Sequence, residues 1–311
     1  MIAEIRLYPN KDRASSLVAL KAIQLGIKEI AAASTGNAGS SLAGICARLG
    51  LTSHIFVPAS IPEGKRLQIQ AYGAFIYTVA GDYDAAFDLC LEASAKNRWY
   101  NRNTAYNPLT IEGKKSAAYD IFLASKGNLP DVIFVPVGDG VIISGLFKGF
   151  DELWKLGWIE DIPKLIAVQA KGSDALFRYW QNNKFEYKPA ATIADSICAG
   201  APRNLYMAAY AAKQSNGKVL VVSDFEILEA QKTAAQKLGF LIEPAAAASL
   251  AGFFKFVESD SLLEKQKVLL FFTGNGLKDI NSLTKWNAHP QMKTAEEWRT
   301  EFFLGDKSRR K

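Results

Sequence analysis

The stretch IKEIAAASTGNAGSSLAGICARLG, residues 27–50, contains the pattern that decides the fold. Its first seven residues, 27–33, are mostly apolar and predict a short strand that is buried in the protein. A Ser-Thr-Gly-Asn turn follows at residues 34–37, and residues 40–50 show helical spacing that ends at a glycine. A strand that passes through a polar turn into a helix is the unit from which parallel α/β sheets are built.

The same order of strand, turn and helix recurs along the chain. Prolines near helix starts and glycines just past helix ends mark the boundaries of the predicted helices. Further apolar runs predict strands at residues 53–59, 74–80, 131–137, 164–170, 217–223 and 267–273. Continuously apolar strands separated by helices indicate parallel sheets covered on both faces. The sequence therefore predicts an α/β protein with two parallel-sheet, three-layer (αβα) lobes.

The two lobes are expected to divide near residues 125–130. We predict an N-terminal lobe over residues 1–127, a C-terminal lobe over residues 128–290 and a basic tail over residues 291–311. The chain carries a formal net charge of +6, and the KSRRK sequence that closes it supplies much of this excess. Since no zinc-finger spacing or basic amphipathic helix accompanies the charge, no nucleic-acid partner is expected.

The composition is that of an ordinary globular protein, with 49% hydrophobic and 22% charged residues. No apolar run reaches the roughly 18 to 20 residues that a bilayer crossing requires, so no membrane partner is expected. The first residues lack the apolar core of a signal peptide. Cys46, Cys90 and Cys198 are widely spaced and are typical of buried thiols in a reducing compartment. These features predict a cytoplasmic protein.

Three turns after predicted strands carry the residues that could bind a ligand. In parallel sheets, ligands bind beyond the carboxyl ends of strands, where backbone N–H groups are presented. The first is the Ser-Thr-Gly-Asn turn, the second is VPVGDGVIISG at residues 135–145, and the third is FFTGNGLKD at residues 271–279. Each turn taken alone could equally be a helix cap or a packing feature.

The glycines of the second turn could hold a phosphate. Gly138 and Gly140 follow a buried strand and precede a helix, so their N–H groups could face an anion. The dinucleotide fingerprint would require a third glycine at position 143, which is Ile143. The spacing therefore disfavours a nicotinamide dehydrogenase.

Lys11 adds a primary amine close to the first turn. A single early lysine is usually exposed to solvent, but this one accompanies a Ser/Thr/Asn nest, a glycine turn and a hydroxyl at a strand end. Pyridoxal phosphate requires this combination, because an amine forms a Schiff base with its aldehyde while the turns hold a carboxylate and a phosphate.

The sequence resembles the fold-type II pyridoxal-phosphate-dependent enzymes of the tryptophan synthase β superfamily, and among them most closely the threonine synthases. The segments that carry the resemblance are KDRASSLVALKA, ASTGNAGSSLAGICARLGL, YNPLTIEGKKSAAYDI, VPVGDGVIISGLFKGF, TIADSICAGAPRN, IEPAAAASLAG and TGNGLKD. They run in family order from residue 11 to about residue 280.

By position, the resemblance implies a role for each residue at the cofactor. Lys11 would hold the cofactor covalently and later transfer protons, and Asn37 would hydrogen-bond the pyridine 3-oxygen. Thr273 would face the pyridine nitrogen, where a neutral hydroxyl suits elimination and replacement better than transamination. The cofactor phosphate would lie against Gly138, Asp139, Gly140, Val141 and Ile142. No metal is expected.

The resemblance also implies where an amino-acid substrate binds. Ser34 and Thr35 would bind its carboxylate, and Asn107 and Lys114 would lie near its phosphate. Threonine synthases typically hold that phosphate with polar residues and an arginine around the Asn-Pro to Glu-Gly segment, and this segment contains no arginine in this chain. Arg102 just upstream, or Lys114 just downstream, could take its place.

The implied activity is a lyase reaction that converts O-phospho-L-homoserine and water to L-threonine and phosphate, in a protein expected to be a homodimer. A β-eliminase similar to threonine or serine dehydratases is the alternative enzyme. The lead-in MIAEIRLYPN is short for the family, so the chain is expected to be N-terminally abbreviated, and an inactive cofactor-binding remnant is a third possibility. Glu243 is either a buried capping carboxylate or an active-site acid.

Overall fold

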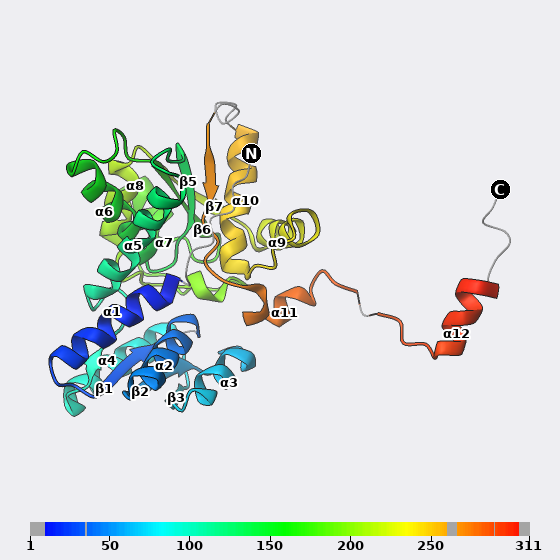
Figure 1. The fold of residues 1–311 in the computed structure, drawn as a ribbon, viewed down its shortest axis with the longest axis horizontal. Coiled ribbons are helices and arrows are strands. Elements are labelled where there is room, and N and C mark those ends of the chain that lie inside the picture. Colours follow the sequence, from blue (N-terminus) through cyan, green and yellow to red (C-terminus); the bar gives the residue numbers. More distant parts are fainter. Residues whose placement is uncertain (1–9, 35, 260–265, 289, 305–311) are drawn as a thin grey trace.

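The computed structural model describes residues 10–34, 36–259, 266–288 and 290–304. Within these residues the chain forms two four-stranded sheets, each with helices packed against it (Figure 1). Every strand pairing inside the two sheets is parallel. The predicted α/β class with two parallel sheets is confirmed.

The first sheet has the strand order β3-β2-β1-β4. It is built from α1 (Asn10–Gln24), β1 (Glu29–Ala33), α2 (Asn37–Leu49), β2 (Thr52–Pro58), α3 (Glu63–Ala71), β3 (Phe75–Val79), α4 (Tyr83–Asn97) and β4 (Tyr100–Asn101). The central strand β1 is apolar because it is covered on both faces: Ile30, Ala31 and Ala32 are fully buried. Helix α2 ends at Gly50, whose φ of 66° is the left-handed conformation that glycine adopts most readily.

The second sheet has the strand order β7-β6-β5-β8. Its elements are β5 (Val132–Pro136), α6 (Val141–Lys155), β6 (Lys164–Ala170), α7 (Ala175–Asn182), the 3₁₀ turn η1 (Asp195–Ile197), α8 (Leu205–Gln214), β7 (Lys218–Val222), α9 (Asp224–Leu238), α10 (Pro244–Ser259), β8 (Val268–Leu270), η3 (Gly276–Lys278) and α11 (Ile280–Leu283). Strand β8 is shorter than the predicted run at 267–273, so Thr273 lies beyond its end. Several elements of the chain, among them β4, α7, η1 and α8, had no counterpart in the predicted strands and helices.

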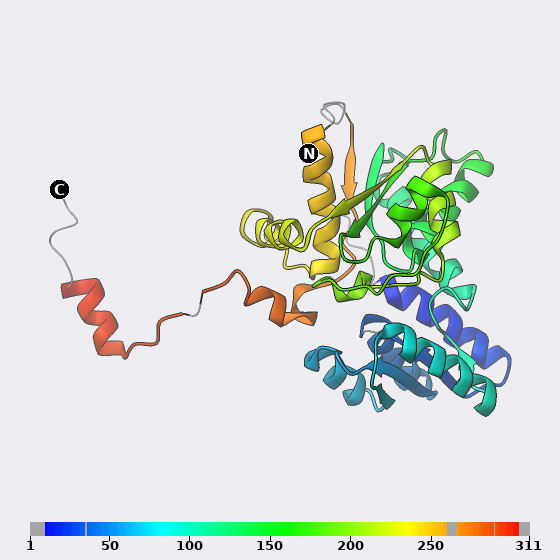
Figure 2. The same ribbon diagram turned by 180° about the vertical axis from the view of Figure 1, so that it is seen from behind.

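Three helices lie between the two sheets and connect them. Helix α5 (Leu109–Ala124) packs against α1 on one side and α6 on the other (Figures 1 and 2). Gly113 permits the first contact, because a Cβ there would lie 2.4 Å from the carbonyl oxygen of Arg13. Gly149 permits the second, because its Cβ would lie 2.6 Å from the Cβ of Ala118. The first approach brings the start of α1 and the first turns of α5 together, and the second holds α6 against α5.

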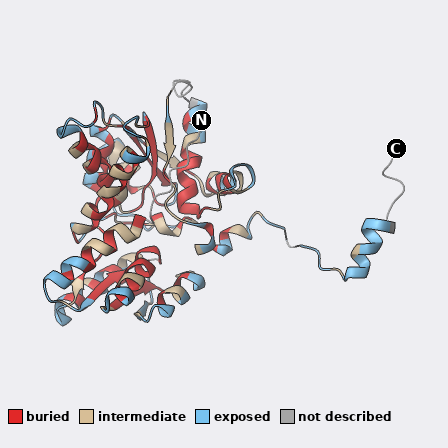
Figure 3. Cartoon of the chain, viewed as in Figure 1, coloured by how far each residue is buried: buried red, intermediate tan, exposed pale blue. Residues whose placement is uncertain are grey.

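Buried residues gather around both sheets, whereas the segment after α11 is mostly exposed (Figure 3). That segment contains α12 (Ala295–Arg299) and the π-helical turn Thr300–Leu304, and it extends away from both sheets. Within the described ranges, no helix combines the length and apolarity needed to cross a bilayer.

Candidate active site

A cavity lies where the carboxyl ends of β1 and β5 meet. Its walls come from the turn after β1, the turn after β5, the first turn of α1, the first turns of α5, and the segment at residues 195–199. The two polar turns singled out in the sequence after these strands therefore face the same cavity, as expected for parallel sheets.

Lys11 enters this cavity from the first turn of α1. Burial, followed by the positive charge of Arg102, lowers its pKa from 10.5 to about 8. The carboxyl groups of Glu243 and Asp139 oppose this shift only in part. Since the uncharged amine is the nucleophilic form, Lys11 is suited to attack an aldehyde near neutral pH.

Two further cations lie buried beside Lys11. The side chain of Lys114 is 1% exposed and lines the cavity, and no hydrogen-bond partner for its Nζ occurs among the described residues. Arg102 is fully buried: its Nε donates to Ser15 Oγ at 3.2 Å and its Nη1 to Thr104 Oγ1 at 3.0 Å, while Nη2 has no described partner. Burial first, then the charges of Lys11 and Arg102, hold the pKa of Lys114 well below its ordinary value. Unpaired buried donors of this kind are prepared for an anionic ligand.

The turn after β1 is held in place by Ser34. Its Oγ accepts hydrogen bonds from the backbone N–H groups of Gly36 and Gly39, each at 2.9 Å. The hydroxyl hydrogen of Ser34 remains to donate into the cavity, which the residue lines. Thr35 was predicted to share this role, but it lies outside the described residues.

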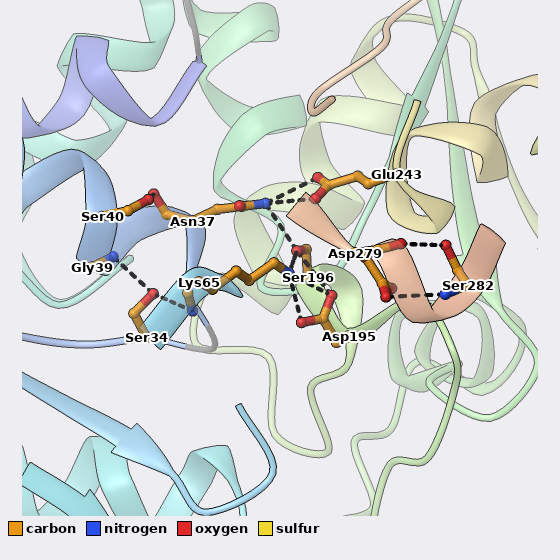
Figure 4. Close-up of polar contacts among 11 residues, drawn as sticks. Ser34, Asn37, Gly39, Ser40, Lys65, Asp195, Ser196, Glu243, Asp279 and Ser282 are labelled. Carbon is orange, nitrogen blue, oxygen red and sulfur yellow. Dashed lines mark hydrogen bonds and ion pairs between the residues drawn. The ribbon is translucent and has the colours of Figure 1, made fainter. Parts of the chain in front are cut away.

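Asn37 points from the same turn toward the second lobe (Figure 4). Its Nδ2 donates to both carboxylate oxygens of Glu243, at 3.0 and 2.9 Å, and to Ser196 Oγ at 3.0 Å. The Oδ1 of Asn37 is buried without a described partner. Burial raises the pKa of Glu243, an effect that the charge of Lys65 and the Asn37 hydrogen bonds reduce. The amide donor predicted for the cofactor is thus engaged by a carboxyl group.

The glycine turn after β5 packs so closely on neighbouring segments of the chain that side chains would not fit at two of its positions. A Cβ on Gly138 would lie 2.7 Å from Ile197 Cα, and one on Gly140 would lie 2.7 Å from Ala208 Cβ. Gly140 also adopts a φ of 87°, in the left-handed region. It caps α6, whose N-terminus receives no side-chain hydrogen bond and whose first turn has no acidic residue. A helix N-terminus of this kind binds anions.

Asp139 lies in this turn with its carboxylate engaged elsewhere. Its Oδ2 accepts from the Tyr83 hydroxyl at 3.1 Å, and its Oδ1 accepts from the backbone N–H of Arg203 at 3.3 Å. Burial raises the pKa of Asp139 and raises that of Tyr83 well above its ordinary value. Tyr83 lines the cavity but was not singled out in the sequence, because nothing local connects it with a residue 56 positions away.

Two predicted residues are not brought to the cavity wall. Asn107 closes its own loop: its Nδ2 donates to the carbonyl oxygen of Asn101 at 2.9 Å, and its Oδ1 accepts from Leu109 N–H at 3.0 Å. It lines a separate groove beside Trp99 and Tyr100. Thr273 is also absent from the residues that line the cavity. It precedes Gly274, whose carbonyl oxygen accepts a hydrogen bond from the N–H of Glu243 at 3.1 Å.

The arrangement fits the cofactor that the sequence resemblance implies. A lysine of lowered pKa could hold its aldehyde, and the uncapped N-terminus of α6 with the two glycines could hold its phosphate. Val141 and Ile142, which were assigned to the phosphate by resemblance, also line the cavity. Residues 195–199 form a wall that the sequence did not identify.

Comparisons with known proteins agree with this fit. Residues 9–274 match the family described as "Pyridoxal-phosphate dependent enzyme". The threonine synthase of Methanocaldococcus jannaschii is 35% identical over 284 residues, which cover 90% of this chain and 70% of that protein. The threonine synthase of Halalkalibacterium halodurans is 38% identical over 274 residues, which cover 88% and 75%.

Solved structures show the same fold. Maize serine racemase has a TM-score of 0.75 at 20% identity, with 89% of this chain and 82% of that chain covered. The processed form of threonine deaminase isoform 2 from Solanum lycopersicum has a TM-score of 0.72 at 22% identity, with 90% and 79% covered.

Proposed function

The chain belongs to the fold-type II family of pyridoxal-phosphate-dependent enzymes, and from this premise we propose that it is a threonine synthase. The reaction would convert O-phospho-L-homoserine and water to L-threonine and phosphate. The named relatives support this choice, since those described above are threonine synthases at 35% and 38% identity. The solved structures, which include a racemase and a deaminase, support only the fold.

Within this proposal the cofactor would be held from both lobes. When bound, pyridoxal phosphate supplies an electron-withdrawing ring that stabilises negative charge beside the substrate's amino group. Lys11 would hold its aldehyde carbon, and the N–H groups around Gly138 and Gly140 would hold its phosphate. Asn37 would contact the ring from the first lobe, and Thr273 is proposed for the ring nitrogen.

Lys11 would also be the base. Once its amine is released from the cofactor, its pKa of about 8 leaves roughly a tenth of it neutral at pH 7, far more than for a lysine with the ordinary pKa of 10.5. It could then take a proton from the substrate carbon next to the amino group and return it later. Ser34 would donate its remaining hydroxyl hydrogen to the substrate carboxylate.

The observation that carries the substrate assignment is the pair of buried cations next to Lys11. Among the described residues neither Lys114 Nζ nor Arg102 Nη2 has a hydrogen-bond partner, so the burial of these groups costs free energy that an anionic ligand would offset. A phosphate at the far end of the substrate would accept a charge-assisted hydrogen bond from Lys114, which lines the cavity, while Arg102, which is buried beyond the lining residues, would add its positive charge. Arg102 and Lys114 would thus replace the arginine that the Asn-Pro to Glu-Gly segment lacks.

The test is a comparison of two products from the purified protein loaded with pyridoxal phosphate. Phosphate and threonine should appear from O-phospho-L-homoserine, whereas threonine or serine alone should yield little ammonia and 2-oxo acid. Exclusive formation of 2-oxo acid would contradict the proposal and support the dehydratase-like β-eliminase. Bound cofactor with no turnover of any of these amino acids would support the inactive remnant.

We also retain the expectations of a homodimer located in the cytoplasm. Sedimentation of the holoprotein tests the first and cell fractionation tests the second. The expected results are a mass of twice the 34.0 kDa chain and recovery in the cytosolic fraction.

A further inference from the structure

A partly buried ion pair joins the two lobes beside the cavity. Lys65, in the first turn of α3, donates from Nζ to Asp195 Oδ1 at 3.0 Å and to Oδ2 at 2.7 Å (Figure 4). The Lys65 side chain is 1% exposed and that of Asp195 is 28% exposed. Ser196 Oγ also accepts from Lys65, at 3.5 Å. The pair therefore spans 130 residues of sequence and links the helix after β2 to the second lobe.

The stem of Lys65 packs on the turn that holds Ser34 and Asn37. A Cβ on Gly36 would lie 2.3 Å from Lys65 Cδ and 2.9 Å from its Cβ. Glycine is required here for two reasons: the φ of 134° is a conformation that other residues rarely adopt, and any side chain would overlap the lysine. Lys65 thus contacts the first polar turn with its methylene groups and the second lobe with its ammonium.

Asp195 begins the segment at residues 195–199, which lines the cavity. This segment presses on the glycine turn, since Ile197 Cα occupies the space beside Gly138. Its far end is fixed by Ser173, whose Oγ donates to the Ile197 carbonyl oxygen at 2.9 Å and accepts from Ala199 N–H at 3.0 Å. At its near end, the partners are Lys65 and, through Ser196, Asn37.

We propose that Lys65 is a positioning residue for the cofactor pocket. Through its ion pair with Asp195, it holds the 195–199 segment against the glycine turn. The ion pair sets the separation between the turn after β1 and the turn after β5. Loss of the pair lets the segment move away from Gly138 and loosens the surface on which the cofactor phosphate lies. The inference depends on the use of pyridoxal phosphate and not on the identity of the amino-acid substrate.

The test is a double-mutant cycle on cofactor binding. Lys65→Met, Asp195→Asn and the double variant are prepared as full-length apoproteins and titrated with pyridoxal phosphate, with the visible absorbance of the bound cofactor as the readout. Each single variant is expected to raise the Kd for the cofactor about tenfold, because it leaves a partner charge without its counterion. The double variant leaves no unpaired charge, so its Kd should rise less than the product of the two single effects.

Lys155→Met is the matched control. Lys155 forms an exposed ion pair with Asp151 at the C-terminal end of α6, whereas the glycine turn lies at the N-terminal end of that helix. Its cofactor Kd should equal that of the wild-type protein. If Lys65→Met does not fold, Asp195→Asn alone decides the outcome, because an unchanged cofactor Kd in that variant would overturn the inference. A fall in melting temperature with an unchanged cofactor Kd, or single effects that simply multiply in the double variant, would overturn the inference.

Discussion

Replacement of Lys114 by Met should stabilise the protein while impairing its proposed reaction. The Lys114 side chain is 1% exposed, and its Nζ is a buried donor that no residue in the described part of the chain satisfies. Met has a similar length and no donor. An unsatisfied buried polar group costs about 1–3 kcal/mol, so we expect the free energy of unfolding of the apoprotein to rise by a similar amount. Differential scanning calorimetry of the apoprotein measures this change.

The same substitution should weaken the use of a phosphorylated substrate. A hydrogen bond between a charged donor and a phosphate contributes about 1.5–3 kcal/mol, which corresponds to a loss of about 10- to 150-fold in kcat/KM for O-phospho-L-homoserine. Phosphate release under steady-state conditions is the assay. Visible absorbance of the bound cofactor should be unchanged, because Lys11 is retained.

The neighbouring Lys115 provides the control for this experiment. Its Nζ lies 2.7 Å from a carboxylate oxygen of Glu112 and 3.0 Å from one of Glu152, outside the cavity. Lys115→Met should therefore lower stability slightly and leave kcat/KM close to the wild-type value. A Lys114→Met variant that is less stable than the wild-type protein, or that retains full kcat/KM, would refute the reasoning about an anion site.

Two further predictions concern the cofactor pocket. Gly138→Ala places a methyl group 2.7 Å from Ile197 Cα, so the backbone must shift at a cost of about 1–3 kcal/mol, and titration should show weaker cofactor binding. Gly64→Ala is the control, because nothing lies within 4 Å of the added methyl group, and it should bind the cofactor normally. Equal cofactor affinities of the two variants would contradict the close contact at Gly138. The rate of cofactor uptake should rise with pH and level off above about pH 8, because only neutral Lys11 reacts with an aldehyde and its pKa in the apoprotein is about 8. Stopped-flow absorbance measures this rate. A rate that does not change with pH below about 8 would contradict a Lys11 pKa of about 8.

Local sequence signals were sufficient for much of the fold. The strand, the Ser-Thr-Gly-Asn turn and the helix of residues 27–50 are contiguous, and their apolar spacing reports directly on burial. The same reasoning brought the turns after β1 and β5 to one cavity, because carboxyl ends of parallel strands carry ligand sites. The two-residue strand β4 was missed because a run of that length has no detectable period.

The parts of the site that were missed depend on contacts between distant residues. Lys65 pairs with Asp195 across 130 positions, and in the sequence it is an ordinary lysine of an amphipathic helix. Asn107 was expected near the substrate, yet its amide satisfies the backbone of its own loop. Asparagines commonly do this in turns, and a sequence motif cannot distinguish that use from ligand binding.

The central claim is that Lys11 carries the cofactor. The holoprotein should be reduced with borohydride, digested and analysed by mass spectrometry, which locates the pyridoxyl group on one lysine. The account predicts that the group lies on Lys11, and that Lys11→Ala takes up no reducible cofactor. A pyridoxyl group on Lys114, the other lysine that lines the cavity, or on no lysine, would contradict it.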